Sequence, residues 1–95
     1  MIKSWASRAS ERLFLESKTR GFAGLDAQFA LELLAVLDAA TALSDLSPLK
    51  SIGLHKLKGD RAGQWAMTVN ARWRVCFRFK GGNAFDVEVV DYHRG

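Results

Sequence analysis

Residues 65–89 read WAMTVNARWRVCFRFKGGNAFDVEV, and in three segments of this stretch large apolar side chains alternate with small or polar ones. A period of two residues places the apolar side chains on one face of a β-strand. The pattern predicts strands over 65–69, 72–80 and 85–89. Because each strand has one apolar face, we expect a sheet with helices packed on one side and an open surface on the other.

The two loops between these strands can be derived from parity, because residues directly opposite each other in an antiparallel pair lie on the same face. Three-residue loops at 70–72 and 81–83 set apolar residues opposite apolar ones, whereas two-residue loops would set apolar against polar. The expected pairs are Val69 with Trp73, Met67 with Val75, Trp65 with Phe77, Phe79 with Phe85, Phe77 with Val87 and Val75 with Val89.

The opposite face of the predicted sheet gathers polar side chains. Arg78 is expected to face Asp86 and to form a cross-strand ion pair with it. Arg74 is expected to face Val90, so it has no acidic partner and is available for a ligand. The remaining members of this face are Thr68, Arg72 at the turn and Tyr92 beyond the last strand.

The residues before the sheet predict two helices. Ser7 can cap a helix that runs from Arg8 to about residue 18. Apolar residues at helical spacing predict a second, longer helix over 26–43, which the serine and proline residues of 44–48 should end. Residues 2–6 can form a short edge strand. We therefore expect one α+β domain over residues 1–95, with two N-terminal helices packed on a small, mainly antiparallel sheet.

Charge is distributed unevenly along the 95 residues, whose net charge is +4. Residues 1–47 hold five Lys/Arg and six Asp/Glu, and residues 48–95 hold nine Lys/Arg and four Asp/Glu. This asymmetry favours a polyanionic partner for the C-terminal half. No apolar run is long enough to span a bilayer and no signal peptide is evident, so we expect a cytoplasmic protein that does not enter membranes.

The residue types exclude several chemistries and favour one. The two histidines and the acids show no metal-ligand spacing, so neither a metal nor another cofactor is predicted, and the single cysteine, Cys76, is expected in the core. The basic and proton-transferring side chains of the C-terminal half remain: Lys56, Lys58, Arg61, Arg72, Arg74, Tyr92 and His93. RNA cleavage without a metal needs such groups, which move protons at the 2′-hydroxyl and the leaving oxygen and stabilise charge on the phosphate.

Several motifs together resemble the HigB family of the RelE-like toxin superfamily, also called plasmid maintenance killer proteins. They are His55-Lys56-Leu57-Lys58-Gly59-Asp60, Gly63-Gln64-Trp65, Thr68-Val69, Trp73-Arg74-Val75, and the terminal Asp91-Tyr92-His93. The resemblance implies a RelE-like fold and a toxin that cuts messenger RNA in the decoding site of the ribosome. It also implies a HigA-like helix-turn-helix antitoxin, and contact with operator DNA only through the complex with that antitoxin.

The same resemblance implies roles for individual residues. Lys58 corresponds to the active-site lysine of the family, Arg74 to its strand arginine, and Asp91, Tyr92 and His93 to its C-terminal catalytic cluster. We expect Lys56, Arg61 and Arg72 to bind RNA, and we expect His93 rather than His55 to transfer protons. The chain departs from its relatives at Asn70, where several have a basic residue, and Arg72 is a candidate substitute.

Two other functions fit the same features. A ParE-like toxin has the same fold but poisons DNA gyrase instead of cutting RNA, so the fold does not separate the two. A non-catalytic RNA-binding or ribosome-binding module would also account for the basic half. A regular last strand would place His93 on the face of Trp73, away from Arg74, unless a bulge or an early strand end reorients it.

Overall fold

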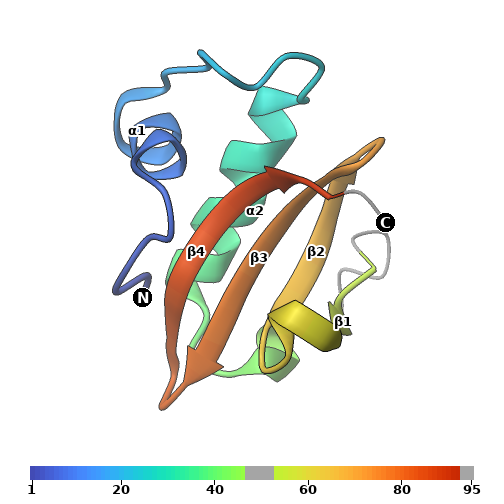
Figure 1. Ribbon diagram of the computed structural model, residues 1–95. Helices are drawn as coiled ribbons and strands as arrows, with labels where there is room; N and C mark the ends of the chain where they lie inside the picture. Colours follow the sequence, from blue (N-terminus) through green and yellow to red (C-terminus); the bar gives the residue numbers. More distant parts are fainter. Residues whose placement is uncertain (47–52, 93–95) are drawn as a thin grey trace.

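The computed structural model describes residues 1–46 and 53–92, and it confirms the expected α+β fold (Figure 1). Four antiparallel strands form one sheet in the order β1-β2-β3-β4. The elements, in chain order, are α1 (Arg8–Glu16), α2 (Ala27–Ala39), the 3₁₀ turn η1 (Leu43–Asp45), β1 (His55–Lys56), the 3₁₀ turn η3 (Gly59–Arg61), β2 (Trp65–Asn70), β3 (Trp73–Lys80) and β4 (Asn83–Asp91).

Polar side chains cap both helices at their first turn. The Ser7 side chain accepts a hydrogen bond from the amide of Ser10, as the sequence predicted for this cap, and α1 ends where Ser17 turns left-handed. Asp26 caps α2 through the amide of Phe29. These side chains satisfy amide donors that have no partner within the helix.

The second helix is shorter than predicted, because it ends at Ala39 rather than near Leu43. Ala40 is extended, and the Asp45 carboxylate accepts hydrogen bonds from the amides of Thr41 and Ala42 at 2.9 and 3.1 Å. These two bonds lower the pKa of Asp45. The alternative hydrogen bonds stabilise the separate turn η1 in place of a further helical turn.

The N-terminal segment lies along the outer edge of β4. Ile2 bridges Ala84 and Trp5 bridges Val87, both in parallel orientation. The expected edge strand is therefore reduced to two isolated bridges. This segment brings α1 to the β4 side of the sheet, far along the strand order from β1 (Figure 1).

Both hairpin loops differ from the prediction. Asn70 pairs with Trp73, so the β2–β3 turn has two residues between them. A register shift between Thr68 and Asn70 then restores the predicted pair of Met67 with Val75. The predicted pair of Trp65 with Phe77 is also present, but Trp73 does not pair with Val69.

In the β3–β4 hairpin, Lys80 pairs with Asn83 across Gly81 and Gly82, again a two-residue turn. Phe85 consequently pairs with Arg78 and not with Phe79, whose partner is Ala84. A bulge at Asp86, with φ 52°, then shifts the register so that the predicted pair of Val75 with Val89 forms. Both loops are therefore one residue shorter than predicted, because the prediction from parity holds only for strands without bulges.

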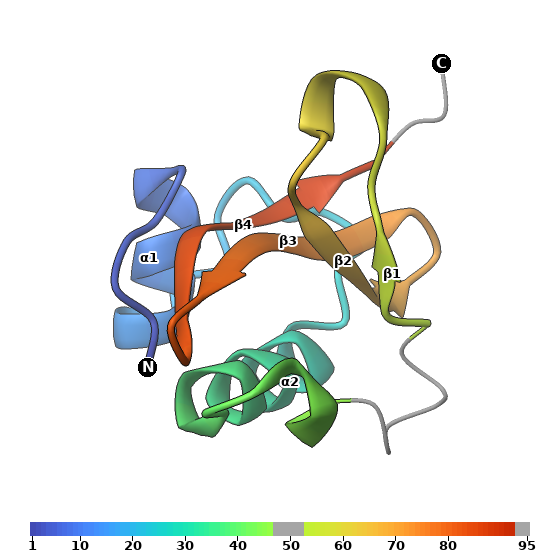
Figure 2. The same ribbon diagram turned by 90° about the horizontal axis from the view of Figure 1, so that it is seen from below.

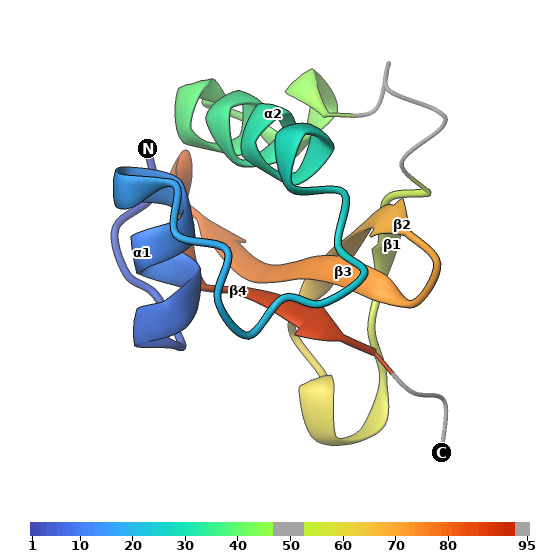
Figure 3. The same ribbon diagram turned by 90° about the horizontal axis from the view of Figure 1, so that it is seen from above.

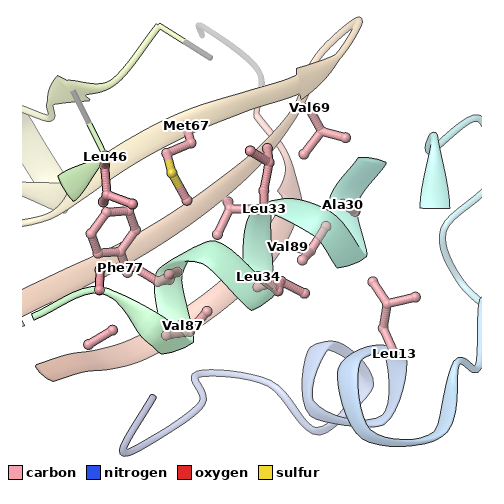
Figure 4. Packing of buried hydrophobic residues seen from close by; sticks show 14 of the residues in the cluster. Leu13, Ala30, Leu33, Leu34, Leu46, Met67, Val69, Phe77, Val87 and Val89 are labelled. Atoms are coloured by element: carbon pink, nitrogen blue, oxygen red, sulfur yellow. The ribbon is translucent and has the colours of Figure 1, made fainter. Parts of the chain in front are cut away.

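The main core lies between the sheet and the helices. Figures 2 and 3 show α2 on one face of the sheet, with α1 beside the β4 edge. Figure 4 shows side chains from the two helices and three strands interlocking there: Leu13, Ala30, Leu33, Leu34, Met67, Val69, Phe77, Val87 and Val89. The other face of the sheet, which α2 does not cover, carries the β1–β2 loop (Figure 2).

Candidate active site

A loop between β1 and β2 stands out from the face of the sheet opposite to α2 (Figure 2). The amide of Leu57 donates to the carbonyl oxygen of Gln64 at 2.8 Å and closes its base. The short turn η3 begins directly after Lys58, whose side chain is exposed. The alternating pattern gave no bounds for the strand at His55–Lys56, because two residues are too short for such a pattern to show.

Two adjoining hollows flank this loop, and Lys58 and Tyr92 line both of them. The first has a volume of about 370 Å³ and is also lined by Asp60, Arg61, Val90 and Asp91. The second adds His55, Lys56 and Leu57. The structure thus brings together Lys58, Asp91 and Tyr92, three of the five residues expected to be catalytic. The fourth, His93, lies outside the described residues.

Tyr92 is positioned by the sheet and by a small apolar cluster beneath it. Its amide donates to the carbonyl oxygen of Arg72 at 2.8 Å, which continues the β3–β4 pairing past Asp91. Its ring packs against a cluster of three buried residues: Leu57, Ala66 and Cys76. These contacts place the ring on the predicted polar face of the sheet and beside Lys58.

His55 is the site residue that the sequence analysis did not select. Its Nδ1 lies 2.8 Å from the carbonyl oxygen of Gly53, and since that oxygen can only accept, Nδ1 carries a proton. In the neutral ring Nε2 is then the unprotonated nitrogen. His55 lies beside Lys58 and Tyr92 in the second hollow, so it is a candidate proton acceptor.

Arg74 faces Val90, as predicted, but its guanidinium is not free. Nη1 donates to the carbonyl oxygens of Ala71 and Trp73 at 2.8 and 3.0 Å. Within the described part of the chain, Arg74 is not among the residues that line the two hollows. It lies at the β2–β3 turn, next to the site.

The three residues expected to bind RNA differ in how firmly they are held. Lys56 and Arg72 are exposed; Lys56 Nζ lies 6.0 Å from the centre of the Trp65 ring, and Arg72 Nε lies 3.5 Å from Asp91 Oδ1. Arg61 is partly buried, and its guanidinium donates to the side chains of Gln64 and Glu88. The predicted ion pair of Arg78 with Asp86 is present at 3.4 Å.

Asn70, where several relatives have a basic residue, has a clear structural role. Its side chain accepts a hydrogen bond from the amide of Asp26 at 2.8 Å and donates one to the carbonyl oxygen of Gly24 at 2.9 Å. It therefore ties the end of β2 to the start of α2. Arg72 is the cation of this turn, and its ion pair with Asp91 directs it toward the end of β4.

Cys76 is buried on the floor of the site, as expected, and its burial raises the pKa of the thiol. A thiol in this setting is a poor nucleophile. Across residues 1–46 and 53–92, no three His, Cys, Asp or Glu side chains gather closely enough to hold a metal ion. No helix within these residues is both long and apolar enough to cross a membrane.

Comparison with known proteins supports the resemblance drawn from the sequence. The family described as "RelE-like toxin of type II toxin-antitoxin system HigB" matches residues 3–93. The protein named endoribonuclease HigB from Proteus vulgaris is 38% identical over 93 residues, which cover 98% of this chain and 100% of that protein.

Proposed function

Because the chain belongs to the family of HigB-like toxins from type II toxin-antitoxin systems, we propose that it stops translation by cutting messenger RNA on the ribosome. The relative named as an endoribonuclease supports RNA cleavage as the reaction. The observation that carries the assignment is the pair of adjoining hollows that Lys58 and Tyr92 both line, with His55 in one and Asp91 in the other. They bring a cation together with groups that can transfer protons.

In the proposed reaction, Nε2 of His55 accepts the proton of a 2′-hydroxyl. The 2′-oxygen attacks phosphorus, the bond from phosphorus to the 5′-oxygen breaks, and a 2′,3′-cyclic phosphate and a 5′-hydroxyl form. Lys58 stabilises the charge on the phosphate oxygens. His93, assisted by Tyr92 and Asp91, gives the leaving 5′-oxygen its proton. No metal takes part in this scheme.

The remaining basic residues guide the RNA. Lys56, which lines the second hollow, and Arg72, which pairs with Asp91, are exposed and contact phosphates of the messenger. Arg74 contributes at the β2–β3 turn, where its guanidinium can exchange carbonyl oxygens for a phosphate, a stronger, charged acceptor. Cleavage takes place in the decoding site of the ribosome, and therefore in the cytoplasm.

A HigA-like helix-turn-helix antitoxin neutralises the protein, and operator DNA is bound only through that complex. The type II family supports an antitoxin partner. Expression of the chain alone should stop growth, and co-expression of the neighbouring antitoxin should restore it. Normal growth in the presence of abundant, folded protein would contradict the toxin role.

The decisive experiment incubates the protein with ribosomes that translate a defined messenger and maps the new RNA ends. We expect cuts within codons in the decoding site and none in the same messenger without ribosomes. A messenger with a single 2′-deoxynucleotide at a mapped site should resist cutting there, and continued cutting would exclude the 2′-hydroxyl mechanism. A gyrase poison would leave the RNA intact and trap cleaved DNA, and a non-catalytic module would bind ribosomes without producing ends.

A further inference from the structure

The loop that carries Lys58 is held at both ends, but its two anchors differ in kind. At the start, Leu57 is buried against the apolar cluster beneath Tyr92. At the end, the anchor is polar, because Arg61 reaches from the loop across the open face of the sheet. Its Nη1 donates to Gln64 Oε1 at 3.1 Å, and its Nη2 lies 3.4 Å from Glu88 Oε1 on β4.

This ion pair is better protected from water than the other pairs of the described chain. The side chains of Arg61 and Glu88 are 29% and 27% exposed, whereas those of Lys18 and Glu16, also 3.4 Å apart, are 61% and 49% exposed. Partial burial weakens the screening of a charge pair by solvent. The Arg61–Glu88 contact therefore restrains the loop more firmly than an ordinary surface pair would.

A second arginine supports the same loop from β3. Arg78 Nη1 donates to the carbonyl oxygen of Ala62 at 3.4 Å. The fit is close, because a Cβ at Gly63 would come within 2.7 Å of that nitrogen. Lys58 thus lies between a buried leucine and two arginine contacts, which leaves its backbone little freedom.

We propose that Glu88 is a positioning residue, which holds Arg61 and thereby fixes the loop so that Lys58 faces Tyr92 across the hollow. The inference rests on the proposed function for its rate effects, but not for its effect on the loop. It assigns Arg61 to the architecture of the site rather than to direct contact with RNA. Glu88 itself lies outside both hollows, on the strand that leads to Tyr92.

The variant Glu88→Ala tests the anchor without any RNA. Amide hydrogen exchange should become faster at Arg61, Ala62 and Gln64, whose amides donate within the loop. The conservative variant Glu88→Gln retains an acceptor oxygen at the same reach and should keep most of the protection. Glu16→Ala removes a pair of the same length on α1 and should leave the loop unchanged. Unchanged exchange in Glu88→Ala would overturn the inference.

Single-turnover cleavage on ribosomes tests the consequence for Lys58. Glu88→Ala should lower the rate constant at saturating ribosomes by about tenfold, since small misplacements of reacting groups have large effects on rate. The ribosome concentration for half-saturation should stay the same. In a Lys58→Ala background the same substitution should change the rate less than about twofold. Glu88 acts on the rate through the position of Lys58, so its effect is lost when the Lys58 side chain is absent.

Equal effects of Glu88→Ala with and without Lys58 would overturn the positioning role. A change in the ribosome concentration for half-saturation alone would also overturn the positioning role, because it would make Arg61 a binding residue. If the unaltered protein failed to cut RNA, the proposed function would fall, while the exchange measurement would still decide whether Glu88 anchors the loop.

Discussion

At the scale of single residues, the hydrogen bond from His55 to Gly53 carries the most chemical information. A backbone carbonyl cannot donate, so the bond selects the tautomer whose Nε2 is free to accept a proton. The sequence could not show this, because residue type alone does not determine which ring nitrogen is bound. It did show the terminal Asp-Tyr-His, which is why His93 was selected and His55 was not.

The two histidines can be separated by substituting each with glutamine, which keeps a polar group but cannot transfer protons near neutral pH. We expect His55→Gln and His93→Gln each to fold, to bind ribosomes and to lower the single-turnover rate by about 10²- to 10⁴-fold. If His55→Gln were fully active, the proton acceptor would have to be another group. Two active variants would remove histidine from the mechanism.

The family resemblance implies active-site roles for both Lys58 and Arg74, and the structure sets the two residues in different surroundings. Lys58 is exposed at the hollow, whereas the guanidinium of Arg74 donates to two carbonyl oxygens of its own turn. We expect Lys58→Ala to cost about 10²-fold in rate, the usual effect of losing one charged contact in the transition state. Arg74→Ala should cost less in rate and should also weaken ribosome binding. Full activity of Lys58→Ala would remove it from the site.

At the scale of elements, the bulge at Asp86 decides which side chains reach the site. A two-residue turn followed by a regular strand would turn Tyr92 toward the helices. The extra residue reverses the alternation, so that Val87 and Val89 enter the core and Tyr92 lies on the open face. The end of β4 is therefore oriented by an irregularity five residues before Asp91.

The sequence predicted the alternating faces correctly but not the bulges, for a physical reason. Alternation records which side chains are buried, and burial is the same for a three-residue loop as for a two-residue loop followed by a bulge. Ala71 and Asp86 both adopt positive φ, at 47° and 52°. Neither alanine nor aspartate indicates a positive φ in the sequence as glycine would. The start of α1 was predicted from its cap, Ser7, and the start of α2 from the helical spacing of its apolar residues.

The bulge makes a direct prediction about stability. Asp86→Val places a β-branched residue in the left-handed region and removes the contacts of Asp86 with Ser4 and Arg78, so unfolding in urea should show a loss of about 2 kcal/mol. Asp86→Gly loses the same contacts but adopts this backbone freely, and should lose less than about 1 kcal/mol. Equal losses in both variants would show that the side-chain contacts, and not the backbone, determine the stability at this position.

At the scale of the whole molecule, the β1–β2 loop and α2 lie on opposite faces of the sheet (Figure 2). All side chains that line the two hollows of the site come from the basic C-terminal half. Proximity of the loop to the end of β4 depends on the complete sheet, so no local motif predicted it. This arrangement leaves the surface around the hollow available for a polyanion, while the negative N-terminal half contributes the core helices.

This arrangement predicts how ribosome binding responds to salt. Each cation that neutralises a phosphate releases counterions, so removing it should reduce the slope of log K against log salt by about 0.7 to 0.9. Lys56→Gln and Arg72→Gln should each reduce the slope by about this amount without changing the rate at saturation. Lys18→Gln is the matched control and should leave the slope unchanged, because Lys18 lines neither hollow of the site and is already paired with Glu16. If all three variants gave the same slope as the unaltered protein, Lys56 and Arg72 would not contact phosphate, and the RNA contacts proposed for them above would be wrong.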